Sequence, residues 1–218
     1  MKKGFVCFLL ISRSLFSQDA APDSAPAGPW KHSLVGALTT NQVSFSNWAQ
    51  GGENALSWAS LLDGKSDYQK NKMNVTNTYK AAYGRTKLGD QGMRKTDDRL
   101  ELESVLVRKT SPTLNPYLAA SLKTQFDRGY IYDTNGIANP VSDFFDPGYL
   151  TQAMGVRYEP NQKIKTRLGI ALREVLTRQF PHYADDPATA KIEKILVQGG
   201  LESVTNIDLK LAENMLFT

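Results

Sequence analysis

The chain has 218 residues, of which 41% are hydrophobic and 22% charged, with a formal net charge of +4 and a mean hydropathy of −0.38. These values exclude a bundle of membrane helices and a disordered chain, but a membrane β-barrel, whose strands turn every second residue to a polar interior, has such a composition. Three of the 26 basic residues (Lys2, Lys3 and Arg13) lie at the start, which leaves 23 against 22 acidic ones, so no nucleic-acid partner is expected.

Residues 1–17 have the pattern of a secretory signal peptide. Two lysines precede an apolar run over residues 4–11, which is too short to span a bilayer. We predict export by a Sec-type route, and a buried N-terminal helix is the alternative. The single cysteine, Cys7, lies in this leader, so the exported chain would have no thiol or disulfide chemistry. Residues 18–29 contain three prolines among small residues and are predicted to be a linker.

From Trp30 onward the hydrophobic residues recur with a period of two, which is typical of β-strands. The clearest stretch is 163–172, where apolar side chains alternate with lysine, arginine, glycine and alanine. Residues 189–197 also fit a helical face, but a strand is expected there. In addition to 163–172, the predicted strands cover residues 33–45, 56–68, 74–83, 99–107, 117–126, 149–158, 195–203 and 207–211.

Short and long breaks between these strands alternate along the chain. The short breaks are 70–72, 110–115, 159–161 and 204–206, and the long ones are 47–53, 89–96, 129–148 and 180–191. An antiparallel meander with this alternation has tight turns at one end and loops at the other, which is the plan of an outer-membrane barrel. A soluble Greek-key sandwich has no reason to alternate so regularly. Tyrosines near predicted strand ends are expected in aromatic girdles at the bilayer interface: Tyr68, Tyr83, Tyr117, Tyr149 and Tyr158.

The polar face of the strands is predicted to line the barrel interior. It carries charges of both signs, which indicates a narrow or plugged pore. The alternative is a soluble sheet whose polar face meets the solvent. The predicted interior charges are Lys80, Glu101, Glu103, Lys123, Lys163, Lys165 and Arg167.

The fold class predicted from these patterns is an all-β, antiparallel up-and-down meander that forms a transmembrane β-barrel over residues 30–218. Nine strands are predicted from the sequence, whereas bacterial single-chain barrels have even numbers. We therefore expect a barrel domain that lacks its last strands.

Patterns that carry chemistry are sparse. His182 lies close in sequence to Asp185 and Asp186 and could activate water in a surface hydrolase, but we prefer to interpret this stretch as a polar loop. Aspartates of residues 127–146 could hold Ca²⁺, but they lack EF-hand spacing and a solvated loop is preferred. We predict no catalytic, cofactor or metal site.

The segment 45–57 is the most distinctive loop sequence. It contains Trp48, Gly51, Gly52 and Asn54. The glycines permit positive φ or close backbone approach, and the amides can bond the loop backbone. We predict a structural loop at the rim of the first hairpin, and the alternative is a rim that binds a sugar or peptide on the Trp48 face.

With those four residues the segment resembles the Trp-x-x-Gly-Gly-x-Asn opening of an uncharacterised family of Bacteroidetes-type bacteria, known only as a domain of unknown function. Residues 72–88 and 96–109 are similar to the strand pair that follows in that family, and 199–217 to a later part. The resemblance implies an outer-membrane β-barrel of a Gram-negative bacterium, without an assigned activity or catalytic residues. Family members continue with further strands, which also implies a truncated chain.

The expected function is that of an integral outer-membrane protein of structural or pore/transport type. Its expected partners are outer-membrane lipid and the barrel assembly machinery, with no cofactor. The alternative, from another class, is a soluble periplasmic β-barrel or sandwich that binds an apolar ligand or a glycan.

Overall fold

The computed structural model describes residues 28–45, 52–161, 163–207, 209–212 and 215–217. The predicted signal peptide, nearly all of the predicted linker, Trp48 and Gly51 lie outside these ranges.

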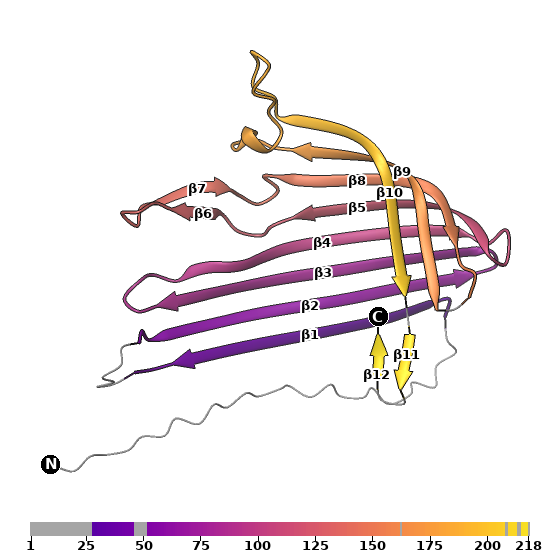
Figure 1. Ribbon diagram of the computed structural model, residues 1–218, viewed down its shortest axis with the longest axis horizontal. Helices are drawn as coiled ribbons and strands as arrows, with labels where there is room; N and C mark the ends of the chain where they lie inside the picture. Colours follow the sequence, from indigo (N-terminus) through magenta and orange to yellow (C-terminus); the bar gives the residue numbers. More distant parts are fainter. Residues whose placement is uncertain (1–27, 46–51, 162, 208, 213–214, 218) are drawn as a thin grey trace, which may run out of the picture.

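Eight strands form one antiparallel sheet in the order β1-β2-β3-β4-β5-β8-β9-β10, and β6–β7 and β11–β12 form two separate hairpins (Figure 1). A 3₁₀ turn, η1 (Pro181–Tyr183), lies between β9 and β10. No helix in the ranges that the structure describes is long and apolar enough to cross a membrane. The strands are β1 (Trp30–Val43), β2 (Ala55–Lys70), β3 (Met73–Leu88), β4 (Arg94–Arg108), β5 (Leu114–Thr124), β6 (Gly129–Tyr132), β7 (Ala138–Ser142), β8 (Gly148–Tyr158), β9 (Ile164–Leu176), β10 (Ile195–Ile207), β11 (Leu209–Ala212) and β12 (Met215–Phe217).

The predicted all-β antiparallel meander is confirmed, because each strand of the large sheet pairs with the next one along the chain, apart from the inserted β6–β7 hairpin. Within the described residues the sheet is open, with β1 and β10 at its edges. It is strongly curved, and β9 and β10 bend over one side of it (Figure 1).

The connections lie alternately at two ends of the sheet, a turn end and a loop end (Figure 1). At the turn end β2 and β3 are joined by Asn71 and Lys72, and Asn71 takes a φ of 56°, which asparagine tolerates well. At the loop end a long connection with the β6–β7 hairpin joins β5 to β8, and another with η1 joins β9 to β10. The loop predicted over 89–96 is shorter than expected, because β3 ends at Leu88 and β4 already begins at Arg94.

The turn predicted at 204–206 is wrong. Val204 and Asn206 pair with Arg167 and Lys165, so β10 runs through the segment to Ile207. The threonine hydroxyls of Thr166 and Thr205 lie 3.2 Å apart across this pair of strands. Local turn propensity is overridden here by a continuous ladder with β9, and the predicted ninth strand is replaced by the end of β10 and the β11–β12 hairpin.

The two faces of the large sheet are distinguished by contacts between strands that are not neighbours. Arg167 of β9 reaches Glu103 of β4 at 2.7 Å, although β5 and β8 lie between them in the sheet. Such a contact is possible only on the concave face. Because successive side chains alternate, the leucines next to these residues, Leu102 and Leu168, are on the convex face.

A buried tyrosine of β5 lies beside two glycines of β8 and β9. Tyr117, Gly155 and Gly169 are cross-strand neighbours on β5, β8 and β9, and Tyr117 is 3% exposed. A Cβ at Gly155 would overlap the Leu168 carbonyl, and one at Gly169 would overlap the Tyr117 hydroxyl. That hydroxyl donates a hydrogen bond to Glu202 Oε1 of β10 at 3.2 Å. Tyr117 is therefore an interior residue, and its predicted place in an outer girdle is wrong.

Gly155→Ala is expected to destabilise the fold by about 3 kcal/mol, because the added methyl group meets backbone rather than a movable side chain. Gly199→Ala in β10 is the matched control, since nothing lies within 4 Å of a Cβ there. The measurement is denaturant unfolding of the refolded protein, followed by tryptophan fluorescence. Equal stability of the two variants would contradict the proposed close packing.

Candidate functional site

The concave face carries a row of alternating charge across four neighbouring strands. Asp63 of β2 is registered with Lys80 of β3, Lys80 with Glu101 of β4, and Glu101 with Lys123 of β5. Lys123 Nζ lies 2.9 Å from Glu101 Oε1. Opposite charges at paired positions of neighbouring strands stabilise this register, whereas like charges there would destabilise it.

A second cluster lies where β9 and β10 bend. The Arg167 side chain is only 12% exposed, and its guanidinium contacts Glu103 at 2.7 Å and Glu202 at 3.3 Å. Towards the turn end, Glu159 pairs with Arg157 at 2.8 Å and with Lys109. Partial burial acts to raise the pKa of the Glu159 carboxyl, but the bonded Lys109 and the nearby Arg157 outweigh it and hold that pKa below its usual value.

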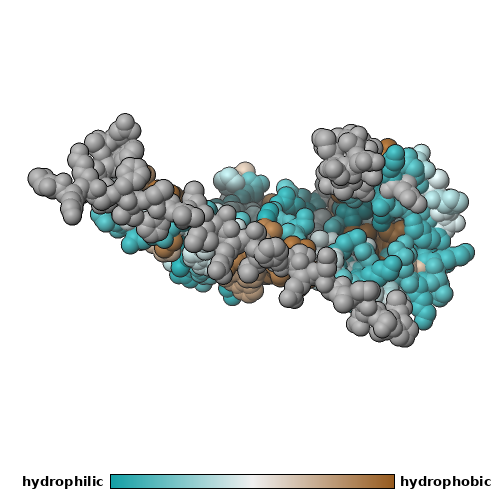
Figure 2. Space-filling model, turned by 90° about the horizontal axis from the view of Figure 1, so that it is seen from below, coloured by the Kyte–Doolittle hydropathy of each residue, from teal (hydrophilic) through white to brown (hydrophobic). Residues whose placement is uncertain are grey.

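A cavity of about 490 Å³ opens beside this cluster, between β2–β4 and the ends of β8, β9 and β10. Figure 2 shows a hollow at this end of the molecule, rimmed mostly by hydrophilic residues. Cationic side chains line the cavity from two sides, and Glu103 is the carboxylate among them. The cationic residues are Lys65 and Lys80 on one side and Arg157, Lys165 and Arg167 on the other. The arrangement can bind charged groups, because few solvating waters compete in a partly enclosed space.

The predicted interior charges fall mostly on this concave face. Lys80, Glu101 and Lys123 belong to the alternating row, Glu103 and Arg167 form an ion pair, and Lys165 lines the cavity. Lys163 precedes β9, in the turn where its N–H donates to Asn161 Oδ1 at 2.9 Å. Sequence reasoning missed four contributors, namely Lys65, Asp63, Arg157 and Glu202. The last three each follow an apolar residue in the strand, which could have revealed them, whereas Lys65 lies between Gly64 and Ser66.

The convex face carries exposed apolar side chains over the whole sheet. A cross-strand series of Leu106, Leu118, Met154, Ile170 and Leu201 runs from β4 to β10 and lines a shallow hollow of about 870 Å³. Further exposed apolar residues on the same face, outside this hollow, are Leu34, Leu38, Leu62, Tyr79 and Leu172.

Two aromatic pairs lie towards the ends of this face on the first strands. Trp30 and Tyr68 have ring centroids 5.0 Å apart near the turn end, and Trp58 and Tyr83 are 5.7 Å apart nearer the loop end. Exposed leucines of β1 and β2 lie between the pairs.

The described part of the predicted loop motif links two loops. Phe45 N–H donates to Asn54 Oδ1, and Gly89 N–H donates to the Asn54 carbonyl, both at 2.7 Å. Gly52 has a φ of 149°, and a Cβ there would meet the Phe45 ring at 2.9 Å. Gly52 and Asn54 therefore fix the loop backbone, and the sequence gives no sign of a ligand for them.

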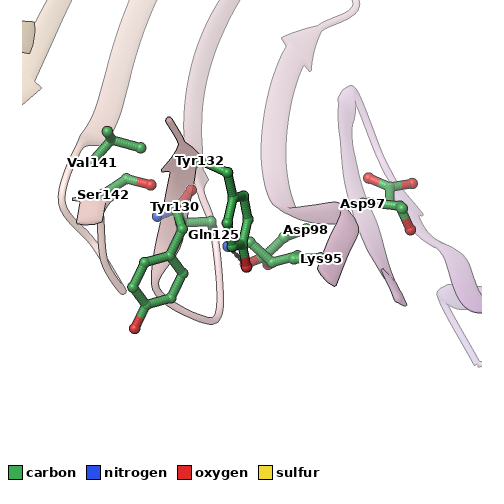
Figure 3. Close-up of a pocket in the computed structure, with 10 residues that line it drawn as sticks. Lys95, Asp97, Asp98, Gln125, Tyr130, Tyr132, Val141 and Ser142 are labelled. Atoms are coloured by element: carbon green, nitrogen blue, oxygen red, sulfur yellow. Dashed lines mark hydrogen bonds and ion pairs between the residues drawn. The ribbon is translucent and has the colours of Figure 1, made fainter. Parts of the chain in front are cut away.

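A pocket of about 250 Å³ at the loop end lies between β4 and the β6–β7 hairpin (Figure 3). Lys95 Nζ lies 2.6 Å from Asp98 Oδ2, and the amides of Phe126 and Asp127 also donate to that carboxylate. Asp97 stands apart from the other labelled side chains in Figure 3. The charges of this pocket are thus used to attach the hairpin loop to β4.

Other carboxylates at the loop end also accept hydrogen bonds from backbone N–H groups. Asp185 Oδ1 accepts from Glu193 N–H and Asp186 Oδ1 from Ala188 N–H, while the His182 ring packs 4.1 Å from that of Tyr183. The surface hydrolase stays an untested alternative to the polar loop that the sequence favours. Among the residues that the structure describes, no three His, Cys, Asp or Glu side chains form a set that could hold a metal ion.

Residues 40–130 match the family described as "Protein of unknown function (DUF3078)". This stretch runs from the end of β1 into β6 and contains the Trp48–Asn54 motif. The match supports the resemblance to a family of unknown function over this part of the chain. No curated protein and no solved structure matches the chain.

Arg167→Gln is expected to destabilise the protein by about 3 kcal/mol, because Glu103 and Glu202 would keep their charge in a half-buried place without a partner. Lys65→Gln breaks a pair with Asp67 whose lysine is 53% exposed, and should cost less than about 1 kcal/mol. Denaturant midpoints of both variants measure the difference. Glu103→Gln in the Arg167→Gln background should restore part of the loss, and a failure to do so would count against the ion-pair account.

Proposed function

We propose that this chain is an integral outer-membrane β-barrel protein of structural or pore/transport type. The convex face contacts lipid, and the charged concave face is the interior. The observation that carries the proposal is the division of the sheet into a convex apolar face with aromatic pairs towards its ends and a concave face with ion pairs.

The spacing of the aromatic pairs fits a bilayer. Trp58 and Tyr68 are ten residues apart on β2, which is about 33 Å along the strand at about 3.3 Å per residue. Barrel strands tilt by about 40°, so the height along the barrel axis is about 25 Å, the height of the apolar band of outer-membrane barrels. The strands of the large sheet have 11 to 16 residues, against about 9–11 needed to cross the bilayer.

The extent of the apolar face favours lipid over a single ligand. A soluble protein that binds an apolar molecule would use the hollow of about 870 Å³ between β4 and β10. Leu34 of β1, which is 68% exposed, and Leu62 of β2 lie on the same face but outside the lining of that hollow. One ligand would leave them in water, whereas a bilayer covers them all.

The interior charges favour a narrow passage or a plugged lumen. Contacts that join β4 to β9 and β5 to β10 cross the concave space and reduce its width. Ion pairs of this kind are compatible with an interior filled by side chains and water. We further propose that the protein reaches the outer membrane after export and is inserted by the barrel assembly machinery.

Leu62→Arg should destabilise the membrane-inserted protein by about 2–4 kcal/mol, because it places a charge in the hydrocarbon midway between the aromatic pairs. Leu61→Arg is the matched control. The two leucines are 41% and 40% exposed, but Leu61 is on the concave face. The measurement is urea unfolding in lipid vesicles, with heat-modifiable migration on gels as the sign of the folded barrel.

In a soluble protein the two arginine variants would behave alike, because both leucines would meet water. Equal stabilities, or recovery of the native protein in the soluble periplasmic fraction, would therefore overturn the membrane proposal.

A further inference from the structure

The cavity beside β9 and β10 has an excess of cationic groups. Five cationic side chains (Lys65, Lys80, Arg157, Lys165 and Arg167) and one carboxylate (Glu103) line its volume of about 490 Å³. They come from β2, β3, β4, β8 and β9, so the sheet must be curved for them to surround one space. None of the interactions described for the fold requires so many cations at one place.

The two arginines are held by carboxylates. Arg167 is fixed by Glu103 and Glu202, and Arg157 by Glu159. These pairs fix the arginine side chains without using their full donor capacity, because a guanidinium has five N–H groups.

The lysines differ from one another. Lys65 pairs with Asp67 at 2.8 Å. Within the part of the chain that the structure describes, Lys80 and Lys165 form no ion pair. Lys80 has two registered neighbours with carboxylates, Asp63 and Glu101. Glu101 is paired with Lys123 on its other side. Two ammonium groups with three donors each are thus available to the cavity.

We propose that this cavity binds a small oxyanion, with Lys80 and Lys165 as the main contacts and Arg157 and Arg167 as supporting positive charge. An oxyanion accepts several charge-assisted hydrogen bonds at once, which suits donors that converge from several strands. Thr78, registered with Lys65 and Glu103, lines the same space, and its hydroxyl can donate a further bond. The site requires only the concave face, so it does not depend on insertion into a membrane.

The test uses inorganic phosphate titrated calorimetrically into the full chain, refolded in neutral detergent at low salt. Saturable binding is expected, and Lys80→Gln and Lys165→Gln should each weaken it about tenfold, since each removes one close charge–charge contact. Lys87→Gln and Lys163→Gln are matched controls that remove the same charge from the same strand or from two residues away, outside the cavity lining. They should weaken binding less than Lys80→Gln and Lys165→Gln do, because neither side chain lines the cavity and the attraction to a bound anion falls with distance.

Lys165→Arg keeps the charge and should keep most of the affinity, which separates a binding role from a structural one. A second titration with glucose 6-phosphate distinguishes free phosphate from a phosphate carried by an organic solute, and binding of either supports the site. Absence of saturable binding of both, or equal weakening by the control variants, would overturn the proposal. If Leu62→Arg and Leu61→Arg proved equally stable while phosphate binding was retained, only the proposed membrane function would be overturned.

Discussion

The structure depends on one constraint: a hydrogen-bonded sheet sends successive side chains to opposite faces, so its curvature decides which set is enclosed. In this chain Tyr117 is the cross-strand neighbour of Gly155, which is paired with Gly169, and its hydroxyl reaches Glu202 of β10. Larger residues at the two glycines would collide with the backbone of the neighbouring strand, and at Gly169 also with the Tyr117 hydroxyl. The curvature of the sheet brings Arg167 of β9 within reach of Glu103 of β4, so that the charged face is partly enclosed.

The alternation of apolar and polar residues predicted the strands and the membership of each face, because that pattern is local. The register between strands is not local, and the missed features depend on it. The stacking of Gly155 beside Gly169 requires β8 and β9 to be aligned at that residue, and nothing in either strand alone specifies it. Tyr117 was assigned to the outer surface from its position near a strand end, whereas its parity within β5 places it on the concave face with Lys123.

Turn propensity was a weaker guide than alternation. Asn71 was correctly placed in a short turn, predicted over 70–72 and reduced in the structure to Asn71 and Lys72, where Asn71 takes a left-handed φ. The Val204–Asn206 stretch has similar turn chemistry but pairs fully with β9, because a β-branched neighbour and an available partner strand outweigh one asparagine. The β6–β7 hairpin was hidden in a segment rich in aspartate and glycine. Its attachment to β4 through Asp98 depends on backbone amides that no side-chain pattern shows.

Carboxylates at the loop end and at the turn end of the sheet have different roles. At the loop end they accept hydrogen bonds from backbone N–H groups and so hold the loop backbone in place. The fully buried Asp146, for example, accepts from the N–H groups of Arg178 and Gln179. Towards the turn end they neutralise cations on the concave face, as Glu103 and Glu159 do. Around the cavity the carboxylates are fewer than the cationic side chains. In the row from Asp63 to Lys123, by contrast, carboxylates and lysines are equal in number. The concave face therefore has a stretch of balanced charge over β2 to β5 and a positive one near β9 and β10.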